Sequence, residues 1–501
     1  MEILTTTHKD RIIGTLGCFD RVIITGTIPQ ICYSQGMTSY LYSQNIRIFD
    51  YSKFAEPFKD ELRANAEQIA KENSIEIEFV RKSHIRKEDL VKKVLEKRGT
   101  HSGLVHIISA MESCNSYTPW HDKQTGRTYL KGSQGKCLHY YFYFIDPYLG
   151  YGYIRVPTWS PFKLQVYING HNILANEFDK HGIKYTMLDN SFDYIGDFEK
   201  AQEISDNIDI KKIHTRLDAL AMKYCPVVSH FGQVYHWSIM QAEYATDIVF
   251  KKQEHLQAIY SELVATAIHT VKPDNIATFL GHKVHPRYKG EIGNNYNIRI
   301  EGSRIKHTMG KSSIKMYDKF SKILRIETTT NDVSFFKHYR EVEHKDGTKS
   351  MQYASLKKNI YSLTLLSSLF KASNKRYLEF ISAFDNKEIG RKRLEKISQS
   401  KKVNNRNYKG FNFFSKVDIA LLLTVLRGEY NISGFRNKDI RMKLPQFNTG
   451  KISRLIKRLK VFGLIKKAKN TYKYYLTKLG KEIVITAQKL KETVLVPALN
   501  Y

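Results

Sequence analysis

Five carboxylates occupy positions typical of metal ligands. Asp20 lies at the edge of a β-branched strand, Glu112 follows a predicted strand, and Asp146 stands at a hairpin turn. Glu243 and Asp247 are four residues apart, so a helix would carry both on one face. Two Mg²⁺ or Mn²⁺ ions need several oxygen ligands, which carboxylates at strand ends beside such a pair would provide. The five residues therefore predict a metal-dependent phosphodiester site, with a salt-bridged helical face as the alternative for the pair.

A second set of potentially reactive side chains lies on two predicted strands at 313–317 and 323–329. Alternation with a period of two would place Tyr317, Arg325 and Glu327 on one face of a hairpin. Tyrosine can attack phosphorus or stack on a base, cations can hold phosphate, and a carboxylate can bind metal. An ion-paired hairpin in a structural core is the alternative. The predicted catalytic members are Tyr317 and Glu327, alongside Asp20, Glu112 and Asp146, and the predicted phosphate contacts are Lys319, Arg325 and the more distant Arg155.

The Tyr-Asp-Lys turn at 317–319 and the Leu-Arg-x-Glu strand at 324–327 resemble a pair found in plasmid and phage replication initiators. The whole chain is also similar to a group of bacterial proteins associated with mobile elements. They share Phe-Asp-Arg at 19–21 and Trp-Ser-x-x-Gln-x-Glu-x-x-x-Asp at 237–247. These resemblances imply a bacterial mobile-element setting. The chain lacks the His-hydrophobe-His triplet of rolling-circle enzymes, which argues against a tyrosine-linked nicking mechanism.

Residues 450–463 predict an amphipathic helix that ends at a glycine. Its apolar residues recur at i, i+3, i+4 and i+7 and form one stripe, while cations occupy much of the remaining circumference. A basic hairpin at 464–476 follows. Such a helix can pack on a small domain and still face a polyanion.

This order of helix, glycine and basic hairpin resembles the winged-helix proteins, particularly the MarR-type regulators. The resemblance covers about residues 413–490, with earlier helices at 417–426 and 437–444. It implies that the helix at 451–462 enters the major groove and that the hairpin touches DNA backbone or the minor groove. The expected DNA contacts are Lys451, Arg454, Lys457 and Arg458 on the helix and Lys467, Lys469 and Lys473 on the hairpin.

Charge and composition favour a nucleic-acid partner. The 501 residues carry a formal net charge of +31, and residues 391–501 contain 27 Lys and Arg against 6 Asp and Glu. This concentrates the expected footprint near the C-terminus. DNA is the expected partner, and the 32 tyrosines keep structured RNA open as another. Without a signal-peptide core or a long apolar run, we expect a cytoplasmic protein with no membrane partner.

The five cysteines are unclustered and odd in number, with no CxxC pair. This pattern excludes a zinc ribbon or knuckle and argues against a disulfide scaffold. We therefore expect Mg²⁺ or Mn²⁺ as the cofactor and no zinc.

The expected fold is a mixed α+β (α/β) N-terminal region followed by a winged helix. Strand and helix alternate over the first hundred residues, with helices at 54–71 and 87–97. An aromatic hairpin is predicted at 138–156, and further helices at 162–178 and 237–267. The expected organisation is an α/β domain at 1–196, a mainly helical region with a hairpin at 197–390, a basic linker at 391–412 and a winged-helix domain at 413–501.

Three functions remain open from the sequence. The leading hypothesis is a DNA-binding protein acting in a mobile-element, recombination or replication setting, with metal-dependent phosphodiester cleavage or transfer as its chemistry. The second is a non-enzymatic MarR-like regulator whose large N-terminal region senses a ligand or oligomerises, and a homodimer stays open. The third is an RNA-binding component of a ribonucleoprotein.

Overall fold

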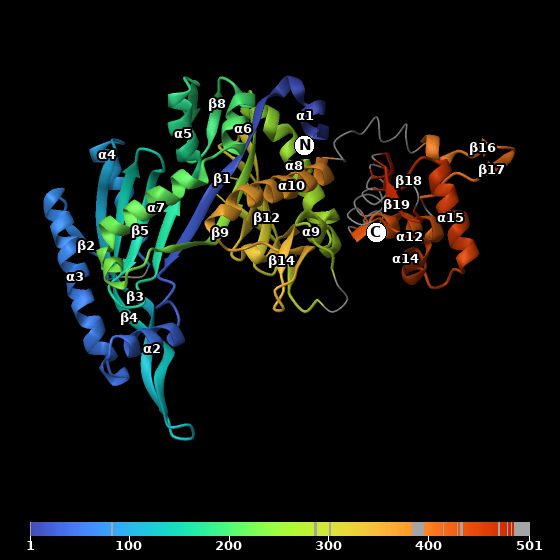
Figure 1. Cartoon of the computed structure of the whole chain (residues 1–501). Coiled ribbons are helices and arrows are strands. Elements are labelled where there is room, and N and C mark those ends of the chain that lie inside the picture. The colour runs from blue at the N-terminus through green and yellow to red at the C-terminus, as the bar shows by residue number, and fades with distance from the viewer. Residues whose placement is uncertain are drawn as a thin grey trace. The chain divides into compact units, whose positions relative to one another are not determined.

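The computed structural model describes residues 2–81, 84–284, 288–299, 302–382, 395–413, 415–427, 429–430, 434–468, 471–477, 479–481 and 483–484. The fold is mixed α+β, as expected, and is built on an 11-stranded sheet (Figure 1). The strand order is β10-β11-β12-β13-β9-β1-β6-β5-β4-β3-β2. Within the described part of the chain, no helix is both long and apolar enough to cross a membrane.

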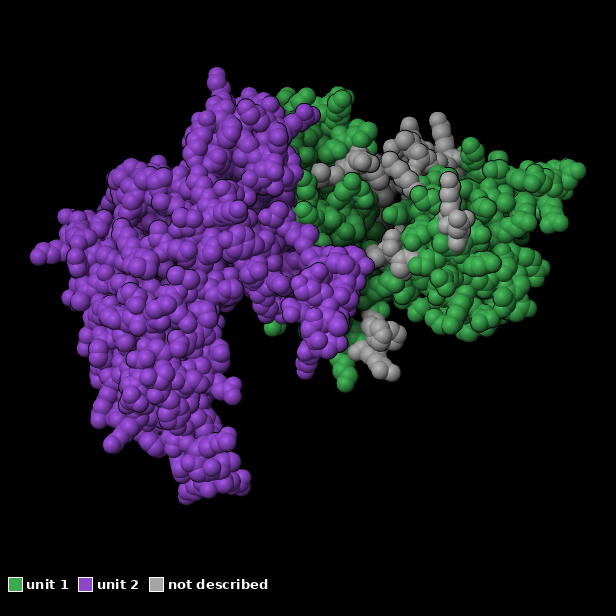
Figure 2. All heavy atoms as spheres, in the orientation of Figure 1, with its two compact units in different colours: residues 1–17, 245–329, 368–501 green, residues 18–244, 330–367 purple. Residues whose placement is uncertain are grey.

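The chain divides into two compact units, which Figure 2 colours separately. Unit 1 contains residues 1–17, 245–329 and 368–501, and unit 2 contains residues 18–244 and 330–367. The long strands β1 (Ile12–Thr27) and β9 (His236–Phe250) each have residues in both units. These units differ from the expected ranges 1–196 and 197–390, because strands that are distant in sequence belong to one sheet.

Five strands of the large sheet lie entirely in unit 2: β2 (Ile77–Phe79), β3 (Gly103–Asp122), β4 (Arg127–Asp146), β5 (Gly150–Pro157) and β6 (Leu164–Ile168). β3 and β4 pair antiparallel from Gly103↔Ile145 to Asp122↔Arg127, with one irregularity near the start. The predicted aromatic hairpin is confirmed as the antiparallel pair β4–β5. Alternating aromatic side chains suit these strands because a pleated, half-buried surface accommodates bulky rings.

Helices accompany these strands in unit 2: α2 (Ser34–Ser43), α3 (Tyr51–Glu72), α4 (Lys87–Arg98), α5 (Gly170–Lys180), α6 (Phe198–Asp206) and α7 (Ile210–Tyr224). The predicted helices at 54–71 and 87–97 are confirmed as α3 and α4. Val91 of α4 packs in a buried cluster with Val105, Ile108 and Tyr143 of the sheet. Two small hairpins complete the unit: β7 (Tyr185–Met187) with β8 (Phe192–Ile195), and β14 (Lys337–Glu343) with β15 (Lys349–Ser355).

Two predicted helices are wrong in their first halves. Residues 236–250 form strand β9, and the helix α8 (Gln253–Thr270) begins only after it. Residues 164–168 form strand β6 before α5. The last seven residues of β9 are all buried, and a strand buried on both faces loses the alternation of polar and apolar residues that distinguishes it from a buried helix. β6 keeps that alternation, but it is only five residues long and is followed at once by α5. Glu243 and Asp247 still share a face, because residues four apart also align on a strand.

Unit 1 contains the other strands of the large sheet: β10 (Ile292–Arg299), β11 (Gly302–Met309), β12 (Ser312–Lys319) and β13 (Ile323–Thr330). The strands predicted at 313–317 and 323–329 are confirmed as β12 and β13. The accompanying helices are α1 (Glu2–Thr7), α8, α9 (Pro273–Phe279) and α10 (Leu363–Ser382). Every residue of β13 is buried, which reflects its central place in the sheet.

The C-terminal part of unit 1 contains short hairpins and helices: β16 (Lys401–Val403), β17 (Arg406–Tyr408), α12 (Lys416–Val425), α14 (Asn437–Lys443), α15 (Thr449–Val461), β18 (Ile465–Lys467) and β19 (Tyr474–Leu476). The three expected helices and the hairpin after them are present in the expected order. The described part of the expected linker differs, because 401–408 pair antiparallel as β16–β17.

Candidate nucleic-acid interface and acidic cluster

Helix α15 separates apolar from cationic residues around its circumference. The side chain of Asn448 accepts a hydrogen bond from the Lys451 backbone N–H at 2.9 Å and caps the helix start. Gly463, with φ of +73°, follows its end. The predicted apolar stripe, Ile452, Leu455, Ile456 and Leu459, is buried, whereas Lys451, Arg454, Lys457 and Lys460 are exposed. The helix therefore presents four cations to solvent from a packed support.

Arg458 differs from the other cations of α15. Its Nη1 and Nη2 donate to the two carboxylate oxygens of Asp418 at 2.7 and 2.9 Å. Its guanidinium lies 4.0 Å from the centre of the Phe411 ring and also donates to the backbone carbonyls of Lys409 and Gly410. Arg458, predicted as a DNA contact, thus holds α15 against α12 and the segment after β17.

The β18–β19 hairpin carries the remaining predicted contacts. Lys467 is exposed and its Nζ lies 5.4 Å from the centre of the Tyr472 ring. Lys473 is half-buried, and Lys469 lies outside the described residues. The described hairpin therefore adds two exposed cations, Lys466 and Lys467, to those of α15, and Lys467 lies beside an aromatic ring.

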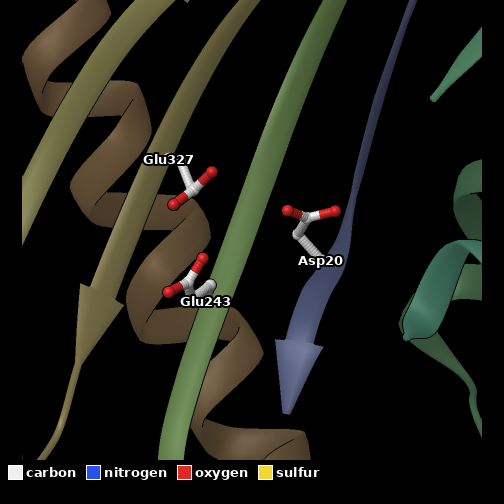
Figure 3. A group of neighbouring side chains, drawn as sticks. All are labelled: Asp20, Glu243 and Glu327. Atoms are coloured by element: carbon white, nitrogen blue, oxygen red, sulfur yellow. The ribbon is translucent and has the colours of Figure 1, made fainter. Parts of the chain in front are cut away.

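Three carboxylates converge on neighbouring strands of the large sheet. Asp20 on β1, Glu243 on β9 and Glu327 on β13 offer oxygen atoms that all lie within 4.8 Å of one another. Figure 3 shows the three carboxylate groups facing a common space. We call these residues the acidic cluster. Carboxylate oxygens at this spacing suit a hard divalent cation such as Mg²⁺ or Mn²⁺.

Glu327 also binds the two reactive side chains of β12. Lys315 Nζ lies 2.5 Å from Glu327 Oε1, and the Tyr317 hydroxyl donates to Glu327 Oε2 at 2.7 Å. Glu327 is 2% exposed, so this hydrogen bonding offsets the cost of burying its charge. A hydroxyl bound to a carboxylate also has the geometry of a nucleophile beside a general base.

The other two members of the acidic cluster contact amide and imidazole side chains. Asn190 Nδ2 donates to Asp20 Oδ1 at 2.5 Å, and His171 Nδ1 lies 3.3 Å from the same oxygen. Gln241 Nε2 donates to Glu243 Oε1 at 2.8 Å. Asp20 is buried and Glu243 is partly exposed. These contacts orient the two carboxylates.

Glu112 belongs to a different group. Its carboxylate accepts from Lys87 Nζ at 2.8 Å, from the Tyr141 hydroxyl at 2.8 and 2.9 Å, and from Arg155 Nη2 at 2.9 Å. Burial favours the neutral acid, but hydrogen bonds from Lys87 and Tyr141 and the charges of Arg155 and Lys87 outweigh it, lowering the pKa of Glu112 to about 2. Glu112, predicted as a metal ligand, and Arg155, predicted as a phosphate contact, therefore bind each other.

Asp146 is also part of a structural ion pair. Its carboxylate binds the Arg216 guanidinium and accepts from the backbone N–H groups of Tyr148 at 2.8 Å and Leu149 at 2.9 Å. These bonds hold the turn between β4 and β5. The structure places Asp146 outside the acidic cluster defined above, although it was predicted as a ligand and catalytic residue.

Asp247 and Arg325 form a buried bidentate pair. Arg325 Nε and Nη2 each lie 2.6 Å from one carboxylate oxygen of Asp247, and Arg325 is 0% exposed. Arg325 was predicted to hold phosphate, but a fully buried guanidinium cannot reach a polymeric substrate. The predicted ligand Asp247 is likewise engaged. Lys319 is half-buried, with its Nζ 5.5 Å from the centre of the Phe320 ring.

No protein-family model, no curated protein and no solved structure matches this chain. Its function is therefore inferred from its own residues. Among the described residues, two of the predicted features suit a functional role: the exposed cations of α15 and its hairpin, and the acidic cluster. Sequence reasoning proposed all three acids of the cluster but distributed them over two sites and added three acids that bind arginines.

Proposed function

We propose that the chain binds DNA through the exposed cations of α15 and of the β18–β19 hairpin, in the mobile-element, recombination or replication setting that its sequence resemblances imply. One observation carries this proposal: α15 buries its apolar stripe completely and leaves Lys451, Arg454, Lys457 and Lys460 in solvent. A surface of this kind lowers the free energy of a bound polyanion, because each neutralised phosphate releases condensed counterions.

The size of the helix favours duplex DNA as the ligand. A single α-helix fits the major groove of B-DNA, where base edges can be read, while cations at its sides reach the phosphates. Thr449–Val461 is 13 residues long, or roughly 20 Å at 1.5 Å per residue. The neighbouring Lys467 lies on a separate hairpin and extends the charge beyond the helix.

A charge-removal variant tests the proposal. We expect K451A/R454A/K457A to lower the salt slope of duplex binding by about 2.7, at about 0.9 for each lost phosphate contact. The measurement is fluorescence anisotropy of a labelled 20-base-pair duplex from 50 to 300 mM KCl. The control, K92A/K93A/K97A, removes the same charge from exposed positions of α4. Equal losses in the two variants would mean that net charge, and not α15, governs binding.

The acidic cluster favours a second function, metal-dependent phosphodiester cleavage or transfer. Asp20, Glu243 and Glu327 would hold Mg²⁺ or Mn²⁺, which would polarise the phosphate and lower the pKa of a bound water. Tyr317 and Lys315 are bound to Glu327, so a hydroxyl and a cation stand beside the same carboxylate. This combination of three acids, a cation and a tyrosine favours phosphodiester chemistry over a purely structural ion pair.

Glu243 provides the sharpest test, because its partial exposure makes the glutamine variant tolerable to the fold. We expect E243Q to weaken Mn²⁺ binding, measured by the electron paramagnetic resonance signal of free Mn²⁺, and to abolish cleavage of labelled single- and double-stranded DNA. E199Q removes the same charge from an exposed position of α6 and should change neither. Cleavage that survives in E243Q would remove the cluster from the reaction.

A further inference from the structure

A cleft opens beside α15, on the side of the β16–β17 hairpin. Its volume is about 860 Å³. Its walls come from the β16–β17 hairpin, the start of α14, one side of α15 and the β18–β19 hairpin. Among its lining residues, all within the described part of the chain, three are cations and none is acidic: Arg406, Lys457 and Lys460. The cleft therefore suits an anionic ligand.

The outer wall is an ordered hairpin in a segment that the sequence indicated to be a linker. Asn404 and Asn405 form its turn with φ of 48° and 57°, the left-handed conformation that two-residue hairpin turns require and that asparagine tolerates. Lys401 Nζ donates to the Val461 carbonyl at the end of α15. Arg458 holds the residues that follow β17 through the Lys409 carbonyl at 2.8 Å. The wall is thus attached to α15 at both of its strands.

Three tyrosines line the same cleft: Tyr408, Tyr472 and Tyr474. Tyr472 is 81% exposed, so most of its ring lies in solvent. Tyr474 stacks on Phe435, with ring centres 5.9 Å apart and planes at 29°. Aromatic rings beside cations bind unpaired bases by stacking while the cations follow the phosphates. A duplex hides the faces of its bases, so these rings suit only an unpaired strand.

We infer that this cleft binds a single-stranded nucleic-acid segment, such as the unpaired extension at the end of a duplex that α15 contacts. The inference extends the proposed DNA binding to an unpaired strand. Only the contact with the duplex rests on the proposed function. Arg406 and Lys460 hold the backbone of the unpaired strand, Lys457 lies at the boundary with the duplex, and Tyr472 stacks on a base. The chain thereby prefers a junction between duplex and single strand over a blunt duplex.

The test compares a blunt 20-base-pair duplex with the same duplex carrying a ten-nucleotide deoxythymidine or uridine extension, and with free dT20, all by fluorescence anisotropy. We expect the extended duplexes to bind about tenfold more tightly than the blunt one, which is the effect of one stacked base worth about 1.4 kcal/mol. A larger gain from the uridine extension would identify RNA as the unpaired strand.

Variants of Tyr472 make the inference specific. We expect Y472A to lose the preference for extended duplexes and to keep the affinity for the blunt duplex, whereas Y472F keeps both because stacking needs only the ring. Tyr339 is 66% exposed on β14, so Y339A is the matched control and should change neither. Equal affinity of the wild-type chain for blunt and extended duplexes, or equal losses on both in Y472A, would overturn the inference. Binding of dT20 without binding of the blunt duplex would instead contradict the proposed function and leave the cleft assignment standing.

Discussion

Glu112 shows how a carboxylate that looked catalytic contributes to stability. In the folded chain its pKa falls to about 2, whereas its ordinary value is 4.5. A pKa depressed by folding stabilises the protein above the ordinary value, and this contribution is lost as the pH falls toward the folded value. A shift of this size corresponds to about 3 kcal/mol for a fully buried group, and solvent screening reduces it to about 1–2 kcal/mol for the partly exposed Glu112, present in full above pH 5 and lost between about pH 4.5 and 2.

We therefore expect E112Q to lower the free energy of unfolding by about 1–2 kcal/mol at pH 7, with the difference from wild type shrinking below pH 4.5. Urea unfolding followed by tryptophan fluorescence measures it, because Trp120, Trp159 and Trp237 all lie in unit 2 with Glu112. E96Q, at an exposed position of α4, serves as the control and should show no such difference. A difference of the same size at pH 7 and pH 2.5 would refute the ion-pair explanation.

The β3–β4 hairpin is an element whose inner and outer parts differ. Tyr117 donates through its hydroxyl to the Ile31 carbonyl at 2.7 Å, and Leu130 is 1% exposed. Beyond the pair Pro119↔Leu130, the strands contain no buried residue, and Trp120 contacts Lys131 with Nζ 3.5 Å from its ring centre. Contacts with the rest of unit 2 therefore hold the inner part of the hairpin. The outer part is held chiefly by the hydrogen bonds between its own two strands.

Replacing residues 120–129 by Asn-Gly should change the free energy of unfolding by less than about 1 kcal/mol, because a two-residue turn closes the remaining ladder and none of the replaced residues is buried. By contrast, L130A should cost about 2–5 kcal/mol, since it leaves a cavity under α2. Urea unfolding monitored by tryptophan fluorescence compares L130A with the shortened hairpin, which keeps Trp159 and Trp237. A shortened hairpin that destabilises as much as L130A would show that the outer part supports the fold.

At the scale of the whole chain, positive charge and the proposed DNA contacts lie together after residue 390. A chain ending at residue 382 lacks 28 of the 80 Lys and Arg residues and only 8 of the 49 acids, but it retains all the strands of the large sheet. We expect this truncated chain to keep its tryptophan emission spectrum and to lose most of its duplex affinity and salt slope, measured by anisotropy. Unchanged DNA binding would place the interface in the first 382 residues.

Local patterns in the sequence were sufficient for features that depend on neighbours along the chain. The stripe of Ile452, Leu455, Ile456 and Leu459 predicts α15 and its exposed cations, because a period of 3.6 residues needs no knowledge of the rest of the fold. The aromatic hairpin β4–β5 and the strand pair β12 and β13 follow from alternation and turns in the same way. The mixed α+β class could be predicted for the same reason.

Only the tertiary structure decided which charged groups meet. Asp20, Glu243 and Glu327 cluster because β9 lies between β1 and β13 in the sheet, an order that no local period encodes. The same strand order pairs Asp247 with Arg325, and the fold of unit 2 pairs Glu112 with Arg155. A carboxylate can bind a metal, an arginine or a lysine with similar chemistry. Its role is therefore set by the partner that the strand order brings within about 3 Å of it.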